Sequence, residues 1–481
     1  MDTQAGAQIS RKAFIQSALI LLVLMLIAGI LTKVVPTGEY QRVQIGDRVQ
    51  VLPDSYQPID PPDYPIWRWF TAPIEVLGGP DALIVIVIIV FILFVGSAFA
   101  VLDESGILES VIAGIVDRFE DRRHLLLAII SLLFMLLGAL FGIFEEVIPL
   151  VPLMIALAYS LGWDSLVGLG MSVLAVNLGF SAAIANPFTI GVAQELAQLP
   201  LFSGLWLRIP IFLVVYGVLM LFLLGYVRRI EEDPRRSLVY NLDQALRSKA
   251  SEAKVAVNIE KQHRWAVIWF VAFVILILLV LLVGSRLPAI SDFLLPIAGV
   301  LFLIGGVGAG IIAQGQVGRP LRSAWSGILG IAPGIPLILM AMSVKHIIAS
   351  GEVLDTILYQ ASGWFDGVSP LAAAVMVLAL TLMIEVFVAS ASAKAFLLMP
   401  ILVPLADLIG LTRQTTVLAY AFGDGFSNMA YPTNAALLIC LGLTVVSFPT
   451  WIRWTARLWF WLLLVSLAGL AVAVAVNYGP F

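Results

Sequence analysis

The sequence predicts an all-α polytopic membrane protein built from two inverted repeats, with about nine full crossings of the bilayer. Three observations lead to this prediction. The 481 residues are 61% hydrophobic and 12% charged, whereas soluble domains are roughly 45–50% apolar and 25% charged. Apolar stretches of about 20 residues, long enough to cross the bilayer as helices, recur along the chain. A polar, proline-containing interruption of such a stretch occurs in both halves.

The plain spans come first, because each is an uninterrupted apolar stretch with few charges. The first is too long for the core of a signal peptide and has no small-residue cleavage site behind it, so it is expected to remain as a membrane span. The loop that follows is expected outside, with a small hairpin in GEYQRVQIGDRVQV and an interfacial, tryptophan-containing segment in PPDYPIWRWFTAPIEVL. The predicted plain spans are residues 13–35, 82–102, 209–227, 266–283, 294–313, 327–349 and 458–476.

Four longer apolar blocks carry polar residues near their middle. Residues 125–161 and 371–409 are expected to be re-entrant hairpins, which leave the bilayer on the side they entered, and residues 165–199 and 414–446 to be broken membrane helices. The charged linker 228–264 is then cytoplasmic, the N-terminus lies in the cytoplasm and the C-terminus lies outside. Most of the 27 lysines and arginines fall on the cytoplasmic side in this arrangement, which agrees with the positive-inside rule.

The two halves of the chain repeat one motif. NLGFSAAIANPFT begins at Asn177 and GDGFSNMAYPTN begins at Gly423, and both contain Gly-Phe-Ser followed by a proline. Upstream, a proline, an alanine and a glycine correspond at one constant offset. Because each half is expected to cross the membrane an even number of times, one extra span between them inverts the second half. The predicted units are a first repeat, a linker, a connecting span and a second repeat, at residues 1–227, 228–264, 265–283 and 284–481.

The interrupted stretches are the candidate binding site. Backbone at bilayer depth must be hydrogen-bonded, so an unwound segment is tolerated only inside protein or beside a hydrated cavity. Proline breaks a helix, glycine permits close approach, and neutral polar side chains suit a carboxylate, an amino group or a hydrated ion. A proline kink in a packed helix is the structural alternative. The candidates are Asn177, Gly179, Ser181, Asn186 and Pro187 in the first break and Gly423, Asp424, Ser427, Asn428, Thr433 and Asn434 in the second.

Ionisable residues at bilayer depth are expensive and usually mark a pathway or a relay. Two adjacent carboxylates at one hairpin tip need cations, protons or hydrogen-bond donors to balance them. At the other tip a lysine occurs, and Glu385 is its possible charge partner across the hairpin; simple mutual neutralisation is the alternative interpretation. The candidate residues at the tips are Glu145 and Glu146 in the first hairpin and Ser390, Ser392 and Lys394 in the second.

Several function classes are excluded by what the sequence lacks. It has one cysteine, Cys440, and three dispersed histidines, so no metal site is expected. It contains no HExxH, GxSxG or ATP-binding glycine motif, so we predict neither an enzyme nor an ATP-driven pump. A secondary transporter with no cofactor, coupled to H⁺ or Na⁺, is expected. An ion channel is the less favoured alternative, because two occluding hairpins suit alternating access better.

In GIFEEVIPLVPLMIALAYSLGWDS, NLGFSAAIANPFTIGVAQELAQLPLFSG and GDGFSNMAYPTN the chain resembles the YfcC family of bacterial membrane carriers. This family is grouped with the anaerobic C4-dicarboxylate carriers in the ion transporter superfamily, and the resemblance covers nearly the whole chain. It implies inverted repeats with hairpins, a homodimer in the bacterial cytoplasmic membrane and an elevator-type displacement. The implied solute is divided between basic amino acids and dicarboxylates.

The second hairpin tip departs from the family pattern. The family tip resembles SGSGQ, whereas this chain has Ser390-Ala391-Ser392-Ala393-Lys394. Because this tip helps to bind sodium in the superfamily, we hypothesise that the Lys394 ammonium replaces that ion. The surplus of acidic residues at depth favours an exchanger of basic or zwitterionic amino acids. A C4-dicarboxylate or related carboxylate transporter is the alternative. The expected partners are a small metabolite, the lipid bilayer and a second copy of the chain, and no nucleic acid.

Overall fold

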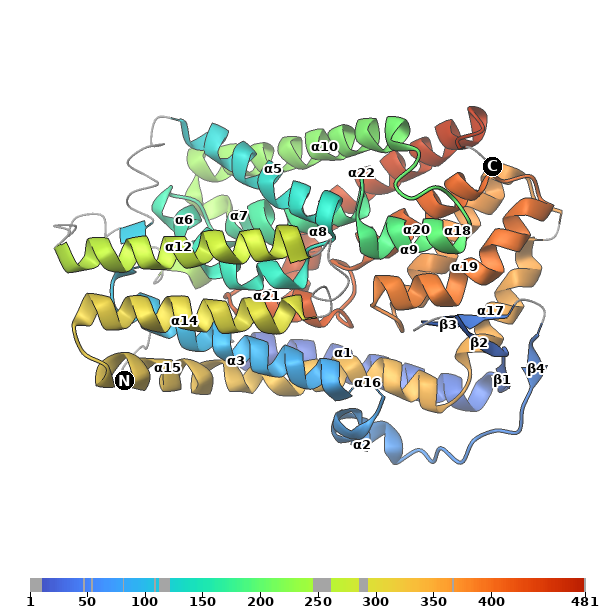
Figure 1. Cartoon of the computed structure of the whole chain (residues 1–481), viewed down its shortest axis with the longest axis horizontal. Helices are drawn as coiled ribbons and strands as arrows, with labels where there is room; N and C mark the ends of the chain where they lie inside the picture. The colour runs from blue at the N-terminus through green and yellow to red at the C-terminus, as the bar shows by residue number, and fades with distance from the viewer. Residues whose placement is uncertain are drawn as a thin grey trace.

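The computed structural model describes residues 11–45, 48–52, 55–80, 82–107, 110–111, 122–244, 261–284, 293–365 and 367–479. Most of its helices run along the long axis of the molecule (Figure 1). Within these residues, six helices are long and apolar enough to cross a membrane, and α15 with α16, bent by 44° at their junction, would make a seventh. The predicted helical, polytopic membrane fold is confirmed at this level. The nine crossings, the inverted repeats and the division into units stay predictions.

The first described element is a helix, and a small β-layer follows it at one end of the molecule (Figure 1). The antiparallel hairpin predicted here is present, with Arg42 of β2 opposite Val51 of β3, and β1 pairs with β4. The predicted interfacial segment contains α2, on which the Arg68 guanidinium donates to the Glu75 carboxylate. The bounds are α1 Arg11–Val34, β1 Gly38–Glu39, β2 Arg42–Ile45, β3 Arg48–Val51, β4 Gln57–Pro58, α2 Arg68–Glu75 and η1 Val76–Gly78.

One group of neighbouring helices, seen in the lower left of Figure 1, is held together by close approaches at glycines. A Cβ on Gly306 of α14 would lie 2.6 Å from the Ala98 Cβ of α3. A Cβ on Gly327 of α15 would lie 2.3 Å from the Gly96 carbonyl oxygen. Both positions therefore let α14 and α15 pack tightly against α3. The bounds are α3 Ala82–Glu104, α12 Lys261–Gly284, α14 Leu294–Gln314, α15 Gly318–Ile331, η7 Ala332–Gly334 and α16 Ile335–Ser350.

The first predicted hairpin and broken helix form a run of short elements. Helix α5 ends in a left-handed Gly142, with φ of +68°. Figure 1 places α6 and α7 on the same side of the molecule as the start of α5. The bounds are α5 Arg123–Phe141, η3 Glu145–Leu150, α6 Val151–Ser160, α7 Ser165–Leu169, η4 Gly170–Leu174, α8 Ala175–Ser181, η5 Pro187–Gly191, α9 Val192–Leu196, α10 Leu205–Glu232 and η6 Pro234–Arg236. The elements η4 and η5 are π-helical turns.

The second predicted hairpin and broken helix lie largely toward the opposite end, where Figure 1 shows α18, α19 and α20 together. Ser369, Ser390, Thr412, Asn434 and Ser447 cap successive helices, each accepting a backbone N–H of the first turn. The bounds are α17 Leu354–Ser362, η8 Gly363–Phe365, α18 Pro370–Glu385, α19 Ala391–Leu408, α20 Arg413–Ser427, α21 Ala435–Gly442 and α22 Phe448–Ala475.

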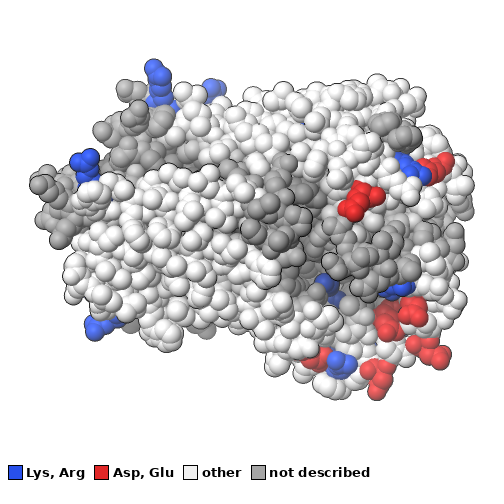
Figure 2. Space-filling view, in the orientation of Figure 1, with Lys and Arg blue, Asp and Glu red and all other residues white. Residues whose placement is uncertain are grey.

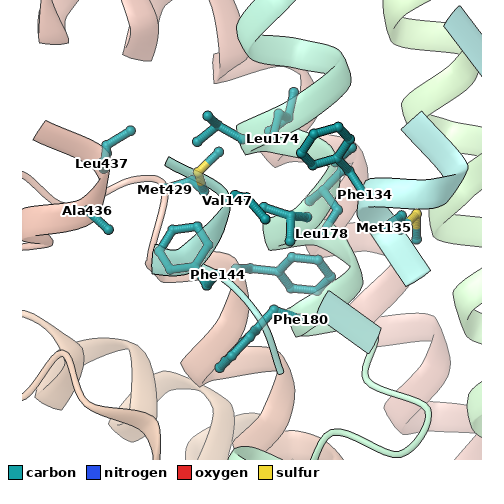
Figure 3. Packing of buried hydrophobic residues seen from close by; sticks show 14 of the residues in the cluster. Phe134, Met135, Phe144, Val147, Leu174, Leu178, Phe180, Met429, Ala436 and Leu437 are labelled. Atoms are coloured by element: carbon teal, nitrogen blue, oxygen red, sulfur yellow. The ribbon is translucent and has the colours of Figure 1, made fainter. Parts of the chain in front are cut away.

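The first hairpin tip and the broken helices belong to one hydrophobic core. Figure 3 shows Phe144 of the tip close to Phe180 of α8, and their ring centroids are 6.3 Å apart. Met429 and Leu437 of the second half belong to the same buried cluster. The two halves therefore share one core at this point.

Candidate functional site

The first break, residues 182–186, separates α8 from η5. Ser181 Oγ donates to the Asn177 carbonyl oxygen at 2.8 Å, which closes the end of α8. The freed N–H groups of Ile184 and Ala185 both donate to the Ala139 carbonyl oxygen at 2.9 Å. Asn186 Oδ1 then accepts the N–H groups of the next turn. The C-terminal end of α5 therefore supplies the hydrogen bonds that unwound backbone needs at depth.

The second break, residues 428–434, separates α20 from α21 and has the same local design. Ser427 Oγ donates to the Gly423 carbonyl oxygen at 2.6 Å, and Asn434 Oδ1 accepts from Leu437 N at 3.1 Å. The Met429 carbonyl oxygen accepts from Trp451 Nε1 at 2.9 Å. Each break thus follows a back-bonded serine and precedes an asparagine cap. Asn434 Nδ2 also donates to Asn428 Oδ1 at 2.9 Å.

The two broken helices touch at Gly425. A Cβ on Gly425 would lie 2.3 Å from the Ser181 Cα, and Asn177 Nδ2 donates to the Gly425 carbonyl oxygen at 3.2 Å. A Cβ on Gly179 would lie 1.8 Å from the Met135 carbonyl oxygen of α5. One on Gly423 would lie 2.6 Å from the Thr381 Cβ of α18. The glycines therefore bring both breaks and the inner ends of both hairpins into one region.

A buried carboxylate–lysine cluster, formed by Glu385, Lys394 and Asp424, lies beside the second break. Lys394 Nζ is 2.7 Å from Asp424 Oδ1 and makes a second ion pair with Glu385 Oε2. The three side chains are 0–1% exposed. Glu385 lies at the end of α18, Lys394 on α19 and Asp424 on α20. The cluster therefore links the second hairpin to the second broken helix.

The first hairpin tip adds a further carboxylate. Glu145, the first residue of η3, has an exposed side chain although Phe144 and Val147 beside it are buried. Its carboxylate interacts electrostatically with Asp424. The first hairpin tip therefore places a third carboxylate in the region of the buried cluster. Only the backbone of Glu146 and Pro187 is described, in η3 and η5.

The breaks and the helical turns beside them also contain buried polar atoms without hydrogen-bond partners among the described residues. They include one acceptor, Asn177 Oδ1, and three groups that can donate, Asn186 Nδ2, Thr189 Oγ1 and Thr433 Oγ1. Such atoms are costly unless something pairs with them. A ligand with a carboxylate and an amino group offers both kinds of partner.

Ser390 caps α19 and Ser392 is half-buried at the second hairpin tip.

Sequence reasoning missed two residues of this region. Thr189 lies within the quoted NLGFSAAIANPFT motif, so its position after Asn186 and Pro187 could have identified it. Tyr420 gave no such signal. It is buried on α20, and its hydroxyl donates to the Ala391 carbonyl oxygen at the second hairpin tip. Tyr420 therefore positions the tip that carries Lys394.

Comparison with known proteins finds relatives of this chain. A relative from Escherichia coli (strain K12), named "Putative basic amino acid antiporter YfcC", is 28% identical over 483 residues, which cover 93% of this chain and 94% of the relative. An "Uncharacterized protein" from Haemophilus influenzae (strain ATCC 51907 / DSM 11121 / KW20 / Rd) is 24% identical over 393 residues, covering 81% and 75%.

Two solved transporter structures align along most of the chain. The Alcanivorax borkumensis YdaH transporter is 20% identical, with a TM-score of 0.44 and coverage of 97% of this chain and 100% of that one. Neisseria gonorrhoeae MtrF is 17% identical, with a TM-score of 0.43 and coverage of 96% and 95%.

The family assignment rests on the match along the chain. The family model described as "DcuC: C4-dicarboxylate anaerobic carrier" matches residues 14–475. The resemblance predicted from the motifs is confirmed by this match and by the E. coli relative. The chain therefore belongs to the C4-dicarboxylate anaerobic carrier family, and it is a multi-pass membrane transporter of small molecules rather than an enzyme.

Proposed function

We propose that this transporter exchanges basic or zwitterionic amino acids across the bacterial cytoplasmic membrane. The observation that carries the proposal is the acidic surplus at the site, where Glu145, Glu385 and Asp424 face a single ammonium, that of Lys394. A cationic side chain is complementary to this surplus. The solute's carboxylate would meet the unpaired donors of the breaks, such as Asn186 Nδ2. The name of the E. coli relative supports the same solute class.

A dicarboxylate is the second candidate, and the family's description favours it. A dicarboxylate needs positive charge at its site. The ammonium of Lys394 is already paired with two buried carboxylates, so the three groups together have no net positive charge. The charge balance therefore favours the amino acid.

The transport cycle we propose is an elevator-type displacement in a homodimer. The first hairpin tip packs on α8 and the second contacts α20, so a solute bound between them would contact elements from both halves, as in inverted-repeat transporters. The positive-inside rule favours a cytoplasmic N-terminus and an external C-terminus. In Figure 2, basic side chains gather at the end where α5 begins, and acidic ones, with a few basic ones, at the end that carries the β-layer.

The test is counterflow in proteoliposomes that contain the purified protein. Labelled arginine or ornithine is supplied outside against the same solute inside, beside parallel assays with succinate and fumarate. We expect saturable uptake of the basic amino acid that requires internal amino acid and is lost in Glu145→Gln. Glu232→Gln is the matched control, because Glu232 is exposed and forms a local ion pair with Arg236. Uptake of succinate or fumarate without arginine uptake would establish the dicarboxylate instead.

A further inference from the structure

The carboxylate–lysine cluster is short of hydrogen-bond donors. Lys394 Nζ lies beside Asp424 Oδ1 and Glu385 Oε2, but Glu385 Oε1 and Asp424 Oδ2 meet no donor among the described residues. Buried acceptors without donors are unfavourable. The cluster therefore needs at least one further donor.

Its charge is unbalanced as well. With both carboxylates ionised, one ammonium leaves a net charge of −1 in a site that solvent does not reach. Glu145 adds negative charge nearby. Among the side chains that the structure describes, the other titratable groups that face this region are the Tyr420 hydroxyl on α20 and the Cys440 thiol on α21, and both are neutral in their ordinary form. Within the described structure, no second cation balances the cluster. An isolated buried charge is normally neutralised by a change of protonation.

Packing decides which cation can enter. A metal cation needs a shell of oxygen ligands around it. The four carboxylate oxygens have essentially no accessible surface, so a metal ion could enter only if the surrounding atoms moved. A proton needs no such room, and on either carboxylate it supplies the missing donor.

We propose that the carboxylate–lysine cluster binds one proton, held by Glu385 or Asp424, and releases it during the transport cycle. This inference rests on the proposed function at one point, because amino-acid exchange would drive the release of the proton. It assigns the coupling ion as H⁺.

The first experiment detects the proton without measuring transport. Infrared difference spectra of the purified protein at neutral pH are recorded in water and after dilution into D₂O, which shifts the C=O stretch of a protonated carboxylic acid. We expect one protonated-carboxyl signal that is altered in Asp424→Asn and in Glu385→Gln and unchanged in Glu232→Gln. Glu145→Gln, which lies outside the cluster, should keep the signal.

The outcomes are separable. Absence of a protonated-carboxyl signal that responds to Asp424→Asn or Glu385→Gln overturns the inference, even if arginine counterflow is observed. If the signal is present and arginine counterflow fails, the proton site stands and the proposed solute falls. Where a single variant does not fold, Lys394→Met combined with Asp424→Asn removes one charge of each sign. Glu385 should then carry the proton alone, and loss of the signal in that folded variant also overturns the proposal.

Discussion

Gly425 shows how strongly single residues constrain the site, because the two broken helices meet at its α-carbon. We expect Gly425→Ala to destabilise the folded protein by at least about 1 kcal/mol, since the new methyl group would overlap Ser181 and force the helices apart. Gly217→Ala is the control, because a Cβ there has open space around it. Thermal unfolding of both variants in detergent checks the prediction. Equal melting temperatures would contradict it.

Lys394 supplies the second prediction at the scale of a residue. If its ammonium takes the place of a coupling sodium ion, arginine counterflow by the unaltered protein should be the same in sodium and in choline buffer. Lys394→Gln leaves Glu385 and Asp424 without their shared cation, so exchange should be lost or become sodium-dependent. Arg236→Gln, at an exposed ion pair, should behave like the unaltered protein. If counterflow depends on sodium to the same extent in the unaltered protein and in Lys394→Gln, the Lys394 ammonium does not take the place of a sodium ion.

Among the elements, the segment that follows α10 is more firmly docked than its polar sequence suggests. Asp243 is fully buried and accepts hydrogen bonds from Tyr159 Oη at 2.8 Å and from the N–H and hydroxyl of Ser165 at 2.8 and 3.0 Å. Asp164, next to Ser165, accepts from the hydroxyl groups of Tyr226 and Ser237. The described start of the predicted linker therefore binds the turn between the first hairpin and the first broken helix.

This docking predicts a pH dependence of stability. Burial raises the pKa of Asp243 from 3.8 to about 6, so the folded state holds this proton more tightly than the unfolded state. Stability from this group is therefore greatest below pH 3.8 and falls as the pH rises through about 6. Asp243→Asn should flatten that fall in a series of melting temperatures between pH 4 and 7. An unchanged slope would show that Asp243 does not titrate in this range.

The Arg68–Glu75 ion pair on helix α2 predicts that stability rises with pH, in a more acidic range than that of Asp243. The Arg68 guanidinium is the main cause that lowers the pKa of Glu75 to about 2, with smaller help from Thr71 and His346. Stability from the ionised carboxylate is complete above pH 4.5 and is lost as the pH falls toward 2. Glu75→Gln should remove this acid-dependent loss from the melting curves while the region above pH 5 keeps its shape. Persistence of the loss in the variant would assign it to another group.

At the scale of the whole molecule, the proposed orientation places β4 and η6 on opposite sides of the membrane. Cys440 is buried, and Cys440→Ser gives a background without cysteine. In that background we expect Gln57→Cys to react with a membrane-impermeant maleimide added to intact cells. Arg235→Cys should react only after permeabilisation, since an odd number of crossings separates the two positions. Labelling of both from outside would reject the topology.

Hydropathy and the positions of glycine and proline predicted most of the order of helices along the chain, because both are properties of the local sequence. The first span was expected at residues 13–35 and is α1, Arg11–Val34, and the two blocks expected as hairpins coincide with α5 to α6 and with α18 to α19. The bend between α15 and α16 was missed, although Pro333 and Pro336 lie at that junction. The pairing of Lys394 with Asp424 could not be predicted. The two residues lie on different elements, and their contact depends on how α19 packs on α20.

The way each break is hydrogen-bonded has a consequence for biogenesis. Ala139 binds the loosened backbone of the first break, and Trp451 binds that of the second, so each partner belongs to the same half of the chain as the break it serves. The first half can complete these bonds in the membrane before the ribosome has made the second. The Asn177 bond to Gly425 must wait until both halves have been inserted, so we expect a nascent chain truncated after α10 to be inserted stably and the joining of the halves to be the late step of assembly.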